Sequence, residues 1–381
     1  MLTRRFFLGG GGAAVAASSM PRIAFARANT SRRFVFIIQR GAADGLSIVG
    51  PTGDPAFANI RENFDQDLTR GTKLGSFFTM HPVLAATAKM YADKQALFIH
   101  AIASPYRDRS HFDGQNVLET GGSAAYQVTD GWLNRLLGLL PRDESNALAL
   151  SDTVPMALRG NNQVSSYAPS KLPTASEDLL QRVAGLYDSD PQLHSLWSEA
   201  VATRMTAGDV ESSGENGAAI GSMAAKLLSE DFGARIAMIE TNGWDTHSNQ
   251  RGRLTTQLKN LDNIVGGLRT GLGADWAKTL VIVATEFGRT ARPNGTGGTD
   301  HGEASLAMLF GGSVAGGKVI ADWPGLSMSA LYEGRDVRPT MDLDSLIGGA
   351  LAQHYALNPA RVMATLFPES RGSAFTQSLI A

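Results

Sequence analysis

The stretch RRFVFIIQRG, residues 32–41, is a continuous apolar run that ends at a glycine. A strand with one solvated face alternates apolar and polar residues, whereas a strand in a parallel sheet is buried on both faces and lacks this alternation. The run therefore predicts a buried strand of a parallel sheet, with its carboxyl end near Gly41.

Four similar apolar runs follow, at residues 96–103, 234–241, 279–288 and 304–312. Helical patterns separate them. The clearest lies in residues 249–272, where apolar side chains recur at steps of three and four, as one helix face requires: Leu254, Leu258, Leu261, Val265, Leu268 and Leu272. Strands that alternate with helices predict a three-layer α/β/α domain with a largely parallel central sheet.

The first 26 residues have the pattern of a targeting segment. Paired Arg4 and Arg5 precede a Gly/Ala-rich stretch that reaches Ala24-Phe25-Ala26, which is typical of a twin-arginine signal peptide cleaved near Ala26 or Ala28. We expect export through the twin-arginine translocase to the periplasm. Stable membrane insertion is not expected, because the apolar part is shorter than the roughly 20 residues that span a bilayer.

Residues 27–381 are long enough for one large α/β domain. Residues 160 to about 230 break the strand-helix alternation with a polar loop, helical patterns and the stretch TAGDVESSGENGAA. We interpret this region as a helical insertion at one edge of the sheet.

Composition excludes several classes of function. The chain has 34 basic and 36 acidic residues and a formal net charge of −2, so it lacks the basic balance of a nucleic-acid-binding protein. It contains no cysteine, so any metal must bind to His, Asp or Glu. That donor set suits zinc, manganese, magnesium or calcium.

Polar clusters follow four of the apolar runs, at the strand ends where open α/β sheets bind their ligands. Taken singly, the clusters favour turn and helix-cap residues, as at Asp44 and Ser110. Together they crowd carboxylates and imidazoles, at a cost that a bound cation offsets. We therefore predict a metal site. The candidate residues are Asp44 after the first run, Arg107, Ser110 and His111 after the second, Asp245 and His247 after the third, and Glu286, Arg289, Asp300 and His301 after the fourth.

Several blocks, in chain order, resemble the bacterial family called domain of unknown function 1501. They are RGAADGLS (40–47), RSHFDGQNVLETG (109–121), GWDTHSNQ (243–250), EFGRT (286–290), NGTGGTDHG (294–302) and the glycine-rich stretch around 311–326. This family is exported by the twin-arginine route and distantly resembles the alkaline phosphatase and sulfatase superfamily. In chain order, the blocks span nearly all of the chain after the leader, from residue 40 to residue 326. The resemblance implies an alkaline-phosphatase-like fold.

That superfamily holds a metal pair with Asp and His side chains. By this resemblance, Asp44 is the first metal ligand, and Asp245 and His247 bind one ion together. Glu286 stands at the strand end where an Asp-His pair is usual, and Phe287 replaces the His. One divalent ion and two are both compatible with this set.

The superfamily also places a Ser, Thr or formylglycine nucleophile at a helix N-terminus. Ser110 resembles this nucleophile, although a one-residue offset puts His111 in the equivalent position. His111 is the alternative residue to complete the metal site. His301 resembles the last histidine ligand, and Asp300 adds a carboxylate.

The implied activity is a periplasmic metal-dependent hydrolysis of a small anionic phosphate or sulfate ester. Arg107, Arg109 or Arg289 would hold the non-bridging oxygens of such an ester. A competing interpretation is a non-catalytic periplasmic binding or assembly protein that keeps a degenerate site. The third interpretation is a structural metal whose only role is to hold the loops in place.

Overall fold

The computed structural model describes residues 32–141, 146–167, 216–229 and 234–381, with single positions at 183, 187, 190, 193 and 197. The predicted signal peptide lies outside these residues, as does most of the predicted insertion at about 160–230. Within the described part of the chain, no helix has both the length and the apolar character needed to cross a membrane.

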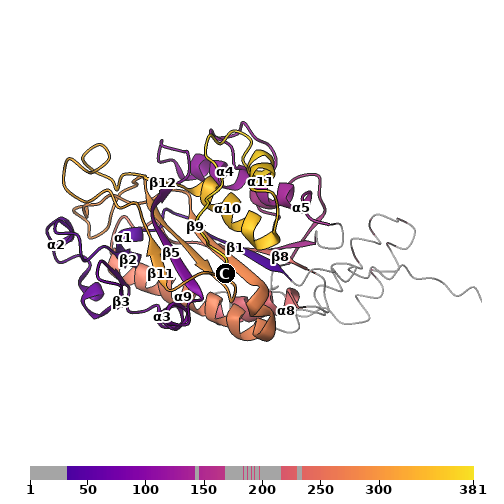
Figure 1. Cartoon of the computed structure of the whole chain (residues 1–381), viewed down its shortest axis with the longest axis horizontal. Coiled ribbons are helices and arrows are strands. Elements are labelled where there is room, and N and C mark those ends of the chain that lie inside the picture. Colours follow the sequence, from indigo (N-terminus) through magenta and orange to yellow (C-terminus); the bar gives the residue numbers. More distant parts are fainter. Residues whose placement is uncertain are drawn as a thin grey trace, which may run out of the picture.

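A nine-stranded mixed sheet forms the centre of the molecule (Figure 1). Its strand order is β11-β5-β10-β9-β1-β8-β6-β7, and β12 also pairs with β5. Among the described strands of this sheet, only β10 is antiparallel to its neighbours, β5 and β9. The strands are β1 (Arg33–Gln39), β5 (Ala96–Ala103), β6 (Ala147–Leu150), β7 (Val164–Ser166), β8 (Ile236–Thr241), β9 (Thr279–Thr285), β10 (Ser305–Phe310), β11 (Lys318–Ile320) and β12 (Met341–Asp342). The predicted largely parallel sheet is confirmed.

Helices cover both faces of this sheet (Figure 1). Alternate side chains of β1 enter two separate cores, as the period of a strand requires. Phe34 and Phe36 pack with α4 (His111–Thr120), α5 (Trp132–Leu137), α10 (Leu343–Tyr355) and α11 (Pro359–Leu366). Val35 and Ile37 pack with α3 (Ala85–Ala92), α8 (Gly217–Leu227) and α9 (Gln250–Leu272). The predicted three-layer α/β/α arrangement is therefore confirmed.

The helix patterns that fall on described residues correspond to helices in the structure. All six predicted apolar positions of α9 are buried. Asp342 caps α10 by accepting a hydrogen bond of 2.7 Å from the Ser345 amide. Ser110 occupies the N-cap position of α4, but its side chain makes no capping hydrogen bond.

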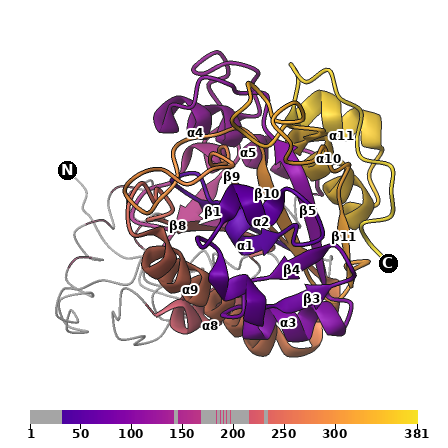
Figure 2. The same cartoon turned by 90° about the vertical axis from the view of Figure 1, so that its left-hand side faces the viewer.

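A small antiparallel sheet lies beside the central one (Figure 2). Its strands are β2 (Val49–Gly50), β4 (Phe78–Met80) and β3 (Thr72–Leu74), in that order. The short helices α1 (Gly45–Ile48) and α2 (Phe57–Arg61) accompany it. Neither the small sheet nor the short edge strands were predicted, because segments of two to four residues show no usable periodicity.

Strand direction brings the polar segments to one edge of the central sheet. Strands β1, β5, β8 and β9 run in the same direction, so the segments that follow them meet at this edge. Strand β10 runs the opposite way, so its amino end reaches the same edge. The residues just before Ser305 therefore join those that follow the parallel strands.

Candidate metal centre

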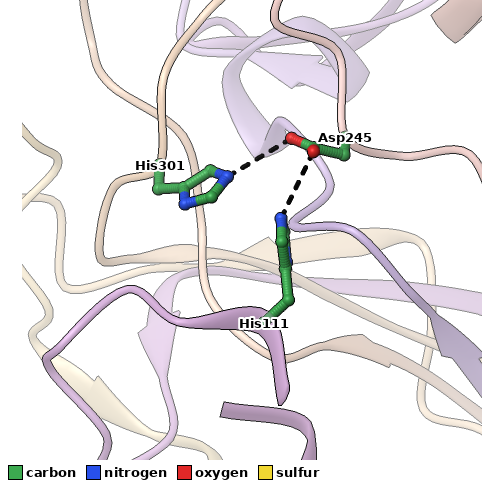
Figure 3. Close-up of side chains that lie close together, drawn as sticks. All are labelled: His111, Asp245 and His301. Carbon is green, nitrogen blue, oxygen red and sulfur yellow. Dashed lines mark hydrogen bonds and ion pairs between the residues drawn. The ribbon is translucent and has the colours of Figure 1, made fainter. Parts of the chain in front are cut away.

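Asp245, His111 and His301 come together at this edge (Figure 3). One potential ligand atom from each lies within 4.8 Å of the others. Asp245 Oδ2 is 3.4 Å from His111 Nε2, and Asp245 Oδ1 is 3.3 Å from His301 Nε2. Asp245 follows β8, His111 is the first residue of α4, and His301 precedes β10. Three segments far apart in the sequence thus supply one cluster.

His247 adds a fourth donor to this cluster. Its Nε2 lies 3.0 Å from Asp245 Oδ1 and 3.0 Å from His301 Nε2. The side chains of Asp245 and His247 are 41% and 45% exposed, so the cluster is open to solvent on one side. We refer to His111, Asp245, His247 and His301 as the donor cluster.

Each imidazole of the donor cluster has an acceptor on the ring nitrogen that faces away from the centre. The pairs are His111 Nδ1 with Glu286 Oε1 at 2.9 Å, His247 Nδ1 with Asp300 Oδ1 at 3.0 Å, and His301 Nδ1 with the Arg109 carbonyl at 2.9 Å. An acceptor at Nδ1 assigns the proton to that nitrogen and leaves the Nε2 lone pair free. Histidines that bind metals in proteins are oriented in the same way.

The donor cluster fits a divalent cation. His111 Nε2 is buried and has no hydrogen-bond partner among the described residues. The Nε2 atoms of His247 and His301 are only 3.0 Å apart, and two lone pairs at that distance repel unless a positive charge lies between them. Three imidazoles and one carboxylate form a donor set that zinc accepts.

Glu286 lies behind the donor cluster, on His111. Its side chain is fully buried. Oε1 accepts hydrogen bonds from His111 Nδ1, from Gln115 Nε2 at 3.0 Å and from the Gly41 amide at 2.8 Å, while Oε2 accepts from Thr285 Oγ1 at 3.0 Å. Burial acts to raise the pKa of Glu286, but the hydrogen bonds outweigh it and lower the pKa overall. Glu286 is therefore ionised, and its carboxylate orients the His111 ring.

The pKa values of the neighbouring imidazoles of His111 and His301 are shifted in opposite directions. The hydrogen bond to Glu286 raises the pKa of His111. Burial, followed by the charge of His111, lowers the pKa of His301. At Asp245, burial acts to raise the pKa, but the hydrogen bond from Arg289 and its charge lower it. An ionised carboxylate facing a neutral imidazole is the state that binds a cation.

Arg289 holds Asp245 from the buried side. Its Nη1 donates to Asp245 Oδ1 at 2.7 Å, and its Nε donates to Thr299 Oγ1 at 3.2 Å. The guanidinium also donates to the Thr299 carbonyl. The predicted role of Arg289 was to bind substrate oxygens, whereas the structure shows it bound to a residue of the donor cluster.

Ser110 and Arg107 lie next to the donor cluster in the sequence, on the segment that leads into α4. The Ser110 side chain makes no capping hydrogen bond. The Ser110 backbone amide donates to the Tyr106 hydroxyl at 3.2 Å. Arg107 donates to the carbonyls of Ser104 and Tyr106, and its Nε lies 3.5 Å from Glu303. These contacts hold the Arg107 guanidinium on its own loop and on the segment before β10.

Asp44 was predicted as a metal ligand, but other donors occupy both of its oxygens. Arg61 binds it with Nη1 at 2.8 Å and Nη2 at 3.0 Å. Ser47 Oγ, the Leu46 amide and Gln250 Nε2 also donate to it. Asp44 is therefore the N-cap of α1 and half of a buried ion pair, and we leave it out of the proposed ligand set.

Phe287 takes part in the site without offering a ligand atom. Its ring stacks on His111, with centroids 5.1 Å apart and an interplanar angle of 21°, and lies 5.3 Å from the His301 ring. The phenyl ring thus packs against the imidazoles of both His111 and His301. The resemblance to the superfamily indicated only that Phe287 replaces a ligand histidine, and it did not suggest this packing role.

Arg109 contributes through its backbone, which the sequence did not indicate. Its carbonyl accepts the hydrogen bond from His301 Nδ1, and its φ of +57° lies in the left-handed region that long side chains rarely adopt. Ion pairs hold the side chain: Glu303 at 3.1 Å, Asp336 at 2.8 Å and Glu333 at 2.8 Å. These contacts stabilise the conformation that aims the carbonyl at His301.

Fold and donor cluster together define an α/β protein with a candidate His/Asp metal centre at the carboxyl edge of its sheet. The model of the family described as protein of unknown function (DUF1501) matches residues 73–367. The chain belongs to this family, as its sequence blocks predicted. A search of curated proteins finds no match.

Solved structures that resemble the chain include three bacterial proteins. The phosphonate monoester hydrolase from Silicibacter pomeroyi has a TM-score of 0.40 at 9% identity, over 91% of this chain and 78% of that one. The zinc complex of the C-terminal periplasmic domain of EptC from Escherichia coli has 0.34 at 9%, over 74% of each chain. The alkaline phosphatase from the Antarctic bacterium TAB5 has 0.34 at 12%, over 76% and 94%. At these scores we draw no residue correspondence from them.

Proposed function

We propose that this protein is a metal-dependent hydrolase of phosphate or sulfate esters. The observation that carries the proposal is the donor cluster, in which the Nε2 atoms of three imidazoles face one carboxylate. Every imidazole is fixed from behind by an acceptor on Nδ1. Outer contacts of this kind orient histidines toward a metal, and the partial exposure of the cluster leaves room for a substrate.

The ligand set supports a single ion, and zinc in preference to magnesium or calcium. Imidazole nitrogen suits zinc, whereas magnesium and calcium prefer oxygen ligands. The further carboxylates predicted as ligands, Asp44, Glu286 and Asp300, accept hydrogen bonds from protein donors instead. When bound, the cation would polarise an ester oxygen and lower the pKa of a hydroxyl nucleophile.

The chain supplies the remaining functions of such a site. Arg289 keeps Asp245 ionised and in place. Glu286 fixes the orientation of the His111 ring. Helix α4 spans ten residues, so its N-terminus offers backbone N–H groups and a partial positive charge to an anion. We propose Ser110, at the N-cap of α4, as the nucleophile toward a small anionic ester.

One observation favours a second candidate, a periplasmic binding or assembly protein with a structural metal. The guanidinium groups expected to hold an ester are all bound to protein acceptors: Arg107, Arg109 and Arg289. A site that only binds or only stabilises its loops needs no such group.

Substitution of Ser110 by alanine separates the two functions. Purified wild-type protein should contain about one metal ion per chain and hydrolyse at least one class in a panel of phosphomonoesters, phosphodiesters and sulfate esters. Ser110→Ala should keep the metal and lose turnover on the order of 10³-fold or more. Ser123→Ala is the matched control, because Ser123 lies beyond the other end of α4 and binds Glu369.

Metal without hydrolysis would support the binding or structural alternative. Hydrolysis that survives in Ser110→Ala would remove the serine from the mechanism. If neither metal nor hydrolysis is found, the proposed function is wrong. Export is tested separately: replacing Arg4 and Arg5 by lysine should leave the chain in the cytoplasmic fraction, whereas unchanged export would contradict the twin-arginine route.

A further inference from the structure

Gln250 is a buried polar side chain at the first turn of α9, and the proposed mechanism does not use it. It is only 1% exposed, and all of its amide hydrogen-bonding groups face protein partners. Its Nε2 donates to Asp44 Oδ2 at 2.5 Å and to Ser47 Oγ at 3.2 Å. This side of the amide is therefore attached to the turn that follows β1.

The other side of the amide binds the two loops that carry donor residues. Gln250 Oε1 accepts from Thr246 Oγ1 at 2.8 Å and from Thr299 Oγ1 at 2.6 Å. Thr246 lies between Asp245 and His247, and Thr299 lies two residues before His301. Both hydroxyl groups are fully buried, so their positions are set by this shared acceptor.

Thr299 extends the connection to the metal-facing carboxylate. Its Oγ1 also accepts from Arg289 Nε at 3.2 Å, and Arg289 Nη1 donates to Asp245 Oδ1 at 2.7 Å. A continuous path of hydrogen bonds therefore runs from the buried Asp44 through Gln250, Thr299 and Arg289 to Asp245. Its members are buried apart from Asp245 itself.

We propose that Gln250 is a positioning residue that sets the geometry of the metal centre by fixing both ligand loops to the Asp44 turn. The inference rests on the proposed function, because it concerns the same donor cluster. Only an amide offers two donors on one side and an acceptor with two lone pairs on the other. Glutamate would face Asp44 with a second carboxylate, and methionine would leave the two threonine hydroxyls without their acceptor.

The test compares Gln250→Met with Gln257→Met, the same change two turns further along α9. Zinc affinity is measured by calorimetry, and thermal unfolding is followed in parallel on the metal-free proteins. Gln250→Met should weaken zinc binding by about 10–100-fold, the effect typical of outer contacts in metal sites. Gln257→Met should bind zinc as wild type does.

Thr246→Val serves if Gln250→Met does not fold, because it keeps the shape of the side chain and removes one hydrogen bond to Gln250. It should weaken zinc binding in the same direction by a smaller factor. Wild-type zinc affinity in a folded Gln250→Met or Thr246→Val protein, together with a lower Tm, would show that Gln250 only stabilises the fold.

Imidazole nitrogen signals in the NMR spectrum of the metal-free protein provide the second readout. They should shift for His247 and His301 in Gln250→Met and stay unchanged in Gln257→Met. If wild type binds no zinc, the proposed function fails. The imidazole signals of the metal-free protein still test whether Gln250 positions the donor cluster. Unchanged imidazole signals in Gln250→Met would overturn it.

Discussion

Asp44 and Asp245 follow neighbouring strands, β1 and β8, and each carboxylate lies against a buried arginine. Asp44 is 2% exposed and uses both oxygens on Arg61 and on the donors around it. The Asp245 side chain is 41% exposed, and only Oδ1 binds Arg289. Its Oδ2 faces His111 Nε2, which has no hydrogen-bond partner among the described residues.

The difference shows what separates a structural carboxylate from a candidate ligand at the same sheet edge. A buried ionised group persists when protein donors satisfy it, as they do around Asp44. A candidate ligand keeps lone pairs directed toward other lone pairs, an arrangement that only a cation or a proton stabilises. Strand-end position alone does not distinguish the two cases.

The largest effect is expected from Asp245→Asn. Asparagine keeps an oxygen for Arg289 and removes the charge that the metal needs. Zinc affinity should fall by more than about 100-fold, beyond the loss typical of an outer contact. The free energy of unfolding of the metal-free protein should fall by at most about 1 kcal/mol, because the Asp245 side chain is 41% exposed. Calorimetry and elemental analysis provide the measurement. Stoichiometric metal in purified Asp245→Asn protein would remove Asp245 from the site.

Asp44→Asn should have the opposite effect, lowering stability while leaving zinc binding intact. Neutralising Asp44 removes the nearer carboxylate of the buried Arg61 and leaves Asp65, 3.5 Å away, beside it, so the free energy of unfolding should fall by up to about 3 kcal/mol. Urea denaturation measures this loss. The folded protein should keep its metal stoichiometry, because the asparagine oxygen can still accept from Gln250. Loss of metal with normal stability would instead make Asp44 a ligand.

A smaller and pH-dependent effect is expected from Asp65→Asn. Burial raises the pKa of Asp65 to about 6 in the folded protein, well above its ordinary value. The folded state therefore holds this proton more tightly, so the free energy of unfolding falls as pH rises from about 4 to 6. Asp65→Asn should remove that fall and add about 1–2 kcal/mol of stability at pH 8, where wild-type Asp65 is ionised while buried.

Urea titrations of Asp65→Asn and wild type at pH 4, 6 and 8 make the comparison. Asp67→Asn is the control, since the hydrogen bond from Arg251, with a further contribution from Arg70, lowers the pKa of Asp67 to about 2. The same slope between pH 4 and 6 in wild type and Asp65→Asn would show that another group near Asp44 carries this proton.

Predictions from local periodicity were accurate in this protein. The five long strands, the apolar face of α9 and the cap of α10 depend on residues two to four positions apart. The candidate site could be predicted only as a set of strand-end residues. His301 shows why: it reaches the donor cluster because β10 runs antiparallel to β5 and β9, and an apolar run does not reveal the direction of a strand.

The partners of the charged residues were the least predictable feature. Glu286 and Asp300, predicted as ligands, accept hydrogen bonds from the outer nitrogens of His111 and His247. Gln250 lies in a sequence block quoted for its neighbours Asp245 and His247, yet nothing in the sequence indicated its contact with Asp44, 206 residues away. Such partners depend on packing between distant segments.

By itself, the sequence determined the fold class, the family and the edge of the sheet where polar residues gather, because these follow from local patterns and ordered motifs. Only the tertiary structure decided which residues face one another there. It bound Asp44 to Arg61 and left Asp245 with three imidazoles. The physical reason is that a carboxylate acquires its role from the donors that surround it, and those donors come from strands and loops far apart in the chain.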